Sequence, residues 1–124
     1  MAPNGQPAGT NSIRLTLGDC VLEENWTGSQ GGYGRSLNAW DSQRKVWHQT
    51  WVDSQGTVLL LDGGPEGTDM VLRGETMGQG GAKVLDRITW QPRSHDEVRQ
   101  LWEVSNDGGR TWTVAFDGRY LRRK

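Results

Sequence analysis

Glu24 and His48 are the two side chains whose chemistry and position best suit proton transfer. Alternation along the strand-like run that holds Glu24 places it on one face with Trp26, so its carboxyl group is expected to point inward. An inward carboxyl group needs a cationic or hydrogen-bonding partner. The arginines available for this are Arg35, Arg87 and Arg99. Two interpretations follow: Glu24 forms a buried ion pair with a structural role, or it transfers protons in a cavity.

His48 lies on another predicted strand, where it is either a general base or a hydrogen-bonded residue with no catalytic role. The other histidine, His95, falls in a predicted turn and is expected to be solvated. The chain has no HExxH motif, no GxxxxGK[ST] motif and no cysteine besides Cys20. The sequence therefore predicts no metal and no cofactor.

Tryptophans and amides are expected to share one face of two neighbouring strands. In the run "VWHQTWVD", alternation places Trp47, Gln49 and Trp51 on the same side. The turn "SQRK" joins this run to "RSLNAWD", and the pairing that results sets Trp40 opposite Trp47 and Asn38 opposite Gln49. Flat apolar walls with a few placed polar groups are typical of a ligand pocket. The alternative is a hydrogen-bonded network that fills a small barrel.

The candidate ligand-binding residues follow from these two faces. They are Glu24, Trp26, Asn38, Trp40, Trp47, Gln49 and Trp51. If the barrel is hollow, the indoles form the walls of the pocket, while the amides and the carboxyl group orient the ligand.

Short apolar runs with period-two alternation, separated by turn residues, cover most of the chain. About nine such runs are joined by hairpin-length links, and no window keeps helical spacing over three turns. The pattern predicts an all-β fold, an antiparallel up-and-down meander that closes into a barrel of about eight or nine strands. We predict a flexible N-terminal segment over residues 1–11 and a single barrel domain over residues 12–122.

Composition narrows the range of partners and compartments. The net charge of −1 gives no electrostatic case for a nucleic-acid or acidic-membrane partner. No apolar run approaches the ~20 residues of a membrane-spanning helix. The start "MAPNGQPAGT" lacks the charged and apolar regions of a secretory signal, so we expect a cytoplasmic protein or a trimmed form of an exported one.

The stretch "SNDGGRTW", from Ser105 to Trp112, resembles the Asp-box of sialidases and other β-propellers. A chain of 124 residues cannot supply the four or more blades of ~40–50 residues that a propeller needs. We therefore interpret the stretch as a hairpin turn whose glycines tolerate positive φ. Threading the hairpin with Val104 opposite Trp112 predicts Trp102 opposite Val114.

Several motifs, in their order along the chain, resemble a bacterial family of largely uncharacterised calycin-like (lipocalin-related) proteins. They include "CVLEENWTG", "GRSLNAWD", "WHQTWVD", "LLLDGG", "RITWQP" and "VRQLWEVSNDGGRTWTVAFDGRY", within a match from about Gly9 to Arg122. The resemblance implies an antiparallel up-and-down barrel with a central cavity, often in an exported protein. It implies no activity.

This chain departs from the family at its start, because relatives usually begin with one or two further strands. Only "MAPNGQPA" precedes the matching segment here. A barrel short of strands exposes an unpaired edge, which a second copy can cover, so we predict a homodimer, with strand exchange as one form. The alternative is that the remaining strands close a smaller barrel.

The function predicted from these features is binding of a hydrophobic or aromatic small molecule in a tryptophan-lined barrel cavity. The alternative is an enzyme, such as a cyclase or isomerase, that acts on a small organic substrate in the same cavity with Glu24 or His48 as the proton-transfer group. Binding of single-stranded nucleic acid is disfavoured, because the sequence has the aromatic side chains for stacking but lacks a basic groove. Carbohydrate binding, which also uses aromatic platforms, stays open.

Overall fold

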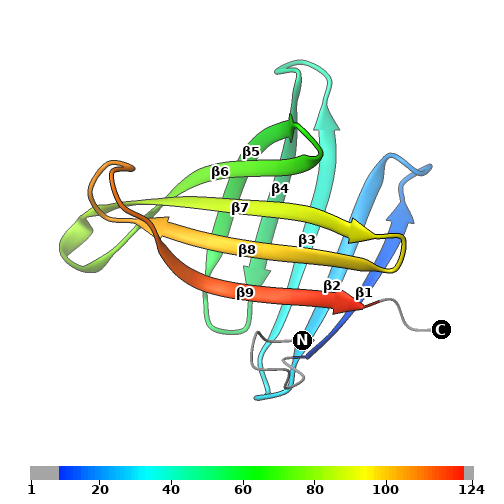
Figure 1. The fold of residues 1–124 in the computed structure, drawn as a ribbon, viewed down its shortest axis with the longest axis horizontal. Coiled ribbons are helices and arrows are strands. Elements are labelled where there is room, and N and C mark those ends of the chain that lie inside the picture. Colours follow the sequence, from blue (N-terminus) through cyan, green and yellow to red (C-terminus); the bar gives the residue numbers. More distant parts are fainter. Residues whose placement is uncertain (1–8, 122–124) are drawn as a thin grey trace.

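The computed structural model describes residues 9–121 as one nine-stranded antiparallel sheet in which every strand pairs with the next along the chain. Figure 1 shows the sheet curling into a nearly closed barrel, with β7, β8 and β9 crossing in front of the first strands. This confirms the predicted all-β meander. The strands are β1 (Gly9–Thr16), β2 (Val21–Gly28), β3 (Tyr33–Asp41), β4 (Val46–Asp53), β5 (Val58–Glu66), β6 (Asp69–Met77), β7 (Lys83–Ser94), β8 (Glu97–Ser105) and β9 (Thr113–Leu121).

The helical content of the described residues is one short 3-10 turn, Gln79–Gly81, between β6 and β7. The first strand begins at Gly9, inside the segment that composition predicts to be flexible. The rest of that segment, residues 1–8, lies outside the described residues, as does the predicted domain end at residue 122.

The register of β3 on β4 is the one that the sequence predicts. Trp40 pairs with Trp47, Asn38 with Gln49, and Ser36 with Trp51. The short turn between the strands fixes this register, because the Asp41 carboxylate accepts hydrogen bonds from the backbone N–H groups of the following residues at 3.0 Å.

The turn from β4 to β5 is built around Asp53 and Gly56. The backbone of Gly56 has a φ of 82°, which favours glycine. One oxygen of Asp53 accepts hydrogen bonds from the backbone N–H groups of Gln55 and Thr57 at 2.9 and 3.0 Å. The same carboxylate reaches the barrel interior, so this turn also positions a polar group of the site.

The β8–β9 hairpin corrects the sequence-based threading. Val104 pairs with Thr113 rather than Trp112, and Trp102 pairs with Phe116 rather than Val114. The predicted register is wrong because the connection is longer than assumed and a β-bulge follows at Trp102/Glu103. In the observed register Phe116 lies opposite Trp102, and both residues line the barrel interior.

The octapeptide between these strands forms the predicted turn. Ser105 Oγ accepts a hydrogen bond from the backbone N–H of Gly109 at 2.9 Å, and Asp107 Oδ1 accepts from the N–H of Thr111 at 2.9 Å. The hydroxyl of Thr111 donates to the other Asp107 oxygen at 2.5 Å. Gly108 has a φ of 77°. These contacts give the stretch a structural role in the hairpin.

The apolar core is small and lies at one side of the barrel interior. It consists of Leu59, Leu61, Leu72 and Ile88, with Trp51, Met70, Trp90 and Trp102 packed against it. The two faces of β5 differ sharply, since Leu61 is fully buried while Leu60 is 57% exposed. The interior also buries polar side chains, namely Glu24, Ser36, Gln49, Asp86 and Ser105.

The two edge strands, β1 and β9, are not paired with each other within residues 9–121. Side chains approach across this side of the barrel instead. Trp26 of β2 packs edge-on against Phe116 of β9, with ring centroids 6.4 Å apart and planes at 88°. The barrel therefore closes here through aromatic contact.

Candidate functional site

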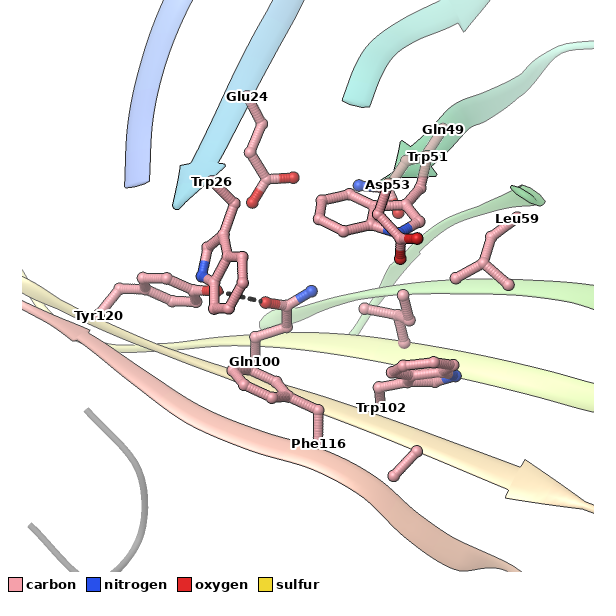
Figure 2. A pocket seen from close by; sticks show the side chains of 12 residues that line it. Glu24, Trp26, Gln49, Trp51, Asp53, Leu59, Gln100, Trp102, Phe116 and Tyr120 are labelled. Atoms are coloured by element: carbon pink, nitrogen blue, oxygen red, sulfur yellow. Dashed lines mark hydrogen bonds between the residues drawn. The ribbon is translucent and has the colours of Figure 1, made fainter. Parts of the chain in front are cut away.

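Two cavities lie inside the barrel and meet at Glu24 and Tyr120, which line both. The smaller has a volume of about 210 Å³ and the larger about 450 Å³. Figure 2 shows the smaller cavity, with side chains from β2, β4, β8 and β9 converging on it. The interior of this barrel is therefore hollow, although buried polar side chains occupy part of it.

The Glu24 carboxylate is held from both neighbouring strands. Glu24 is 3% exposed and accepts a hydrogen bond from Asn11 Nδ2 of β1 at 2.6 Å on one oxygen. The other oxygen accepts from the hydroxyl of Ser36, its β3 partner, at 2.7 Å. An amide nitrogen only donates, so the Glu24 oxygen that faces Asn11 is an acceptor.

Ser36 links Glu24 to the amides that the sequence analysis singled out. Its hydroxyl has one proton, which goes to Glu24, and its lone pairs face Asn38 Nδ2 at 2.9 Å and Gln49 Nε2 at 3.4 Å. This arrangement sets the orientation of the Gln49 amide, since the reverse orientation would place two acceptors against each other. Gln49 Oε1 is buried and receives no hydrogen bond from the described residues.

Aromatic rings form most of the wall of the smaller cavity. The rings are those of Trp26, Trp51, Trp102, Phe116 and Tyr120. The indole N–H of Trp51 donates to Asp53 Oδ2 at 3.1 Å, and that of Trp102 donates to Asp86 Oδ1 at 3.0 Å. Because both N–H groups have partners, these indoles are satisfied inside the barrel.

Asp53 is a carboxylate at the edge of the smaller cavity. Burial raises its pKa, but hydrogen bonds from the Thr57 backbone, from the Trp51 indole and from the Gln55 backbone hold the pKa below its usual value. Asp53 is therefore ionised near neutral pH and adds negative charge to the cavity lining.

Tyr120 keeps its proton in this environment. Burial raises the pKa of its hydroxyl, and the nearby Glu24 carboxylate raises it further. The hydroxyl donates to Gln100 Oε1 at 2.9 Å, as the dashed line in Figure 2 marks. Tyr120 is therefore a neutral hydrogen-bonding group between the two cavities.

The larger cavity is mainly apolar and lies toward the β1–β2 turn. Its apolar lining consists of Ile13, Leu15, Leu22, Trp47, Met70, Leu72, Trp90 and Val98. Ile13 and Leu15 are 52% and 60% exposed, so apolar surface continues to the outside of the molecule. Such a surface suits contact with an apolar molecule.

His48 differs in its setting from the other predicted residues. His48 is among the residues that line the larger cavity, but its ring contacts Asp62 through Nδ1 at 2.8 Å and the Thr50 hydroxyl through Nε2 at 2.7 Å. Asp62 also accepts a hydrogen bond from Arg44 at 2.7 Å, and this contact lowers the pKa of Asp62. Both ring nitrogens of His48 are therefore occupied by protein groups.

The structure brings most of the predicted residues to the two cavities. Trp26, Gln49 and Trp51 line the smaller one, Asn38 and Trp47 line the larger one, and Glu24 lines both. Trp40 does not line either of these two cavities. It is 46% exposed and packs edge-to-face on Trp47, with ring centroids 5.7 Å apart.

The prediction that Glu24 pairs with an arginine is wrong, because its hydrogen-bond partners are Asn11 and Ser36. Arg87 pairs with Glu103 at 3.1 Å and Arg99 pairs with Asp117 at 2.8 Å, while Arg35 is exposed. The partners observed for Glu24 are uncharged, and Asn11 belongs to the segment that composition predicts to be flexible.

Sequence reasoning also missed part of the lining. Gln100, Trp102, Phe116 and Tyr120 belong to the smaller cavity. Their alternation along β8 and β9 was visible, but the closure that carries β9 across to β2 is a long-range feature that local pairing does not reveal.

Within residues 9–121, no group of three or more His, Cys, Asp or Glu side chains could hold a metal ion. No helix in the same range is long and apolar enough to cross a membrane. A scan against models of known protein families finds no match, and a search of curated proteins finds none either. The barrel is compatible with a calycin-like fold.

Proposed function

We propose that this protein binds a small hydrophobic or aromatic molecule inside the barrel. The observation that supports the proposal is a pair of adjoining cavities of about 450 and 210 Å³, with apolar and indole walls and a few buried polar groups. This is the composition of small-molecule sites, where apolar area supplies affinity and a few polar groups set orientation.

Tryptophan fluorescence tests the proposal directly, because Trp26, Trp47, Trp51, Trp90 and Trp102 line the cavities. A panel of apolar metabolites, together with a polarity-sensitive apolar dye, should change the emission in a saturable way. The variant Val98→Phe fills part of the larger cavity and should weaken binding, whereas Val52→Phe on the exposed face of β4 should not. Unchanged emission with every compound and with the dye would contradict the proposal.

The second candidate is an enzyme, favoured by the position of Glu24 at the junction of the two cavities. A buried carboxylate beside a bound substrate can accept a proton, and orientation in a cavity supplies much of the rate. Glu24 suits this role better than His48, whose nitrogens already contact Asp62 and Thr50. Full turnover of an identified substrate by Glu24→Gln would exclude proton transfer by Glu24.

Membership of the calycin-like family and a homodimeric state belong to the same proposal. The motif order and the barrel support the family. The unpaired edges of β1 and β9 within residues 9–121 support the dimer, because an exposed edge can add a strand from a second copy.

A further inference from the structure

The lining of the two cavities carries negative but little positive charge. Glu24 and Asp53 line the smaller cavity, and Asp19 and Glu24 line the larger one. Among the described residues that line them there is no lysine or arginine, and His48 is the sole histidine. Of these carboxylates Glu24 alone is buried, at 3% exposure, and its hydrogen-bond partners are uncharged. A buried carboxylate without a cation is unfavourable, so a cationic guest would gain from lying beside Glu24.

Two buried hydrogen-bond acceptors in the interior have no partner among the described residues. They are Gln49 Oε1 and Asn11 Oδ1. Two nearby donors point elsewhere, since Asn11 Nδ2 donates to Glu24 and the Ser36 hydroxyl does the same. Gln49, which is 2% exposed, lines the smaller cavity together with Glu24. A guest placed there should bring N–H or O–H donors.

The aromatic rings around the smaller cavity also favour a cationic guest. Trp26, Trp51, Trp102, Phe116 and Tyr120 surround the smaller cavity. Ring faces attract cations, and several rings around a small space are the arrangement by which proteins hold ammonium groups. Figure 2 shows Trp26 and Tyr120 near Glu24 and Trp102 on the far side of the cavity, while Phe116 packs edge-on against Trp26.

We propose that the ligand carries a protonated amine, which occupies the smaller cavity against Glu24 and Gln49, while its apolar body lies in the larger cavity. This inference rests on the proposed function, because it names the chemical class of the molecule that the barrel binds. Other head groups should bind more weakly than the amine. A neutral alcohol supplies a hydrogen-bond donor without charge, and a quaternary ammonium supplies charge without a donor. A carboxylate is repelled by Glu24.

Four probes that share one body and differ in the head group test this ranking. They are phenethylamine, phenethyl alcohol, phenylacetate and phenethyltrimethylammonium, titrated into the full chain and followed by calorimetry and tryptophan fluorescence. The amine should bind at least about ten-fold more tightly than the alcohol, because a hydrogen bond to a charged group is stronger than one between neutral groups. The trimethylammonium should bind more weakly than the amine, and phenylacetate most weakly of all.

A matched pair of charge-removing variants locates the effect. Glu24→Gln should remove most of the preference for the amine over the alcohol, whereas Glu75→Gln, on an exposed side chain of β6, should leave it unchanged. The ranking in the unaltered protein decides the question even if Glu24→Gln does not fold.

The outcomes separate this inference from the proposed function. If the alcohol or the trimethylammonium binds as tightly as the amine, or if Glu24→Gln keeps the preference, the amine is ruled out while binding of an apolar molecule stands. If none of the four probes binds but the apolar dye does, the proposed amine ligand is likewise ruled out, and the proposed binding of an apolar molecule stands. If neither the probes nor the dye bind, both proposals fail.

Discussion

The Ser36 hydroxyl donates to Glu24 Oε1 at 2.7 Å, across two strands on which the two residues are direct partners. Ser36 also faces the amides of Asn38 and Gln49, so one hydroxyl organises three polar side chains. Ser36→Ala leaves the buried carboxylate with one donor fewer. We expect it to lower the free energy of unfolding by about 1–3 kcal/mol.

Urea unfolding followed by tryptophan fluorescence measures this loss. Ser42→Ala, in the exposed β3–β4 turn, is the control and should change stability by less than about 0.5 kcal/mol. Equal effects of the two substitutions would mean that the Ser36 contact contributes nothing specific.

Neighbouring leucines on β5 test which face of the sheet is inside. Leu61 is fully buried in the core, so Leu61→Ala should cost about 2–5 kcal/mol of stability. Leu60→Ala, one position away and 57% exposed, should cost less than about 0.5 kcal/mol. Thermal or urea denaturation compares the two, and the reverse order would mean that the strand face is inverted.

The β8–β9 turn should contribute stability that depends on pH. Hydrogen bonds from the Thr111 hydroxyl and backbone lower the pKa of Asp107 to about 2, from an ordinary value of 3.8. A lowered pKa in the folded state favours folding above pH 3.8, and this contribution is lost as the pH falls through about 2. Asp107→Asn should therefore flatten that part of the stability profile.

Unfolding at a series of pH values between neutrality and acid measures the Asp107 contribution. Thr111→Val, which removes the hydroxyl but keeps the backbone N–H, should produce a smaller change in the same direction. A profile that is identical in the unaltered protein and in Asp107→Asn would contradict the assignment.

Light scattering coupled to gel filtration tests the proposed homodimer. We expect a mass about twice the 13.8 kDa of the chain, because the edges of β1 and β9 can accept a further strand. A dimer that forms by mass action should dissociate on dilution. A single mass near that of one chain at every concentration would rule the dimer out.

The sequence predicts best what is local. Trp40 opposite Trp47 follows from a short turn and strict alternation, and the structure has that pair. The β8–β9 register is wrong beyond the turn, because no residue pattern announced the bulge at Trp102/Glu103. Alternation predicts an inward Glu24, but composition places its partner Asn11 in a flexible segment.

What the sequence could not supply is the closure of the barrel. The contact of Trp26 with Phe116 joins residues that are far apart in the chain, and it depends on the accumulated twist and coil of seven intervening strand pairings. The same long-range geometry brings Tyr120 beside Glu24, so part of the site was beyond local reasoning.

We expect the proposed guest to enter on the side of the barrel between β1 and β9. Elsewhere, parting two neighbouring strands would break a ladder of backbone hydrogen bonds, whereas within residues 9–121 no such ladder crosses this line. Widening it separates side chains such as Trp26 and Phe116 and leaves the sheet intact. For the proposed guest we therefore expect entry to depend on movements of side chains, which are far faster than the unzipping of a strand.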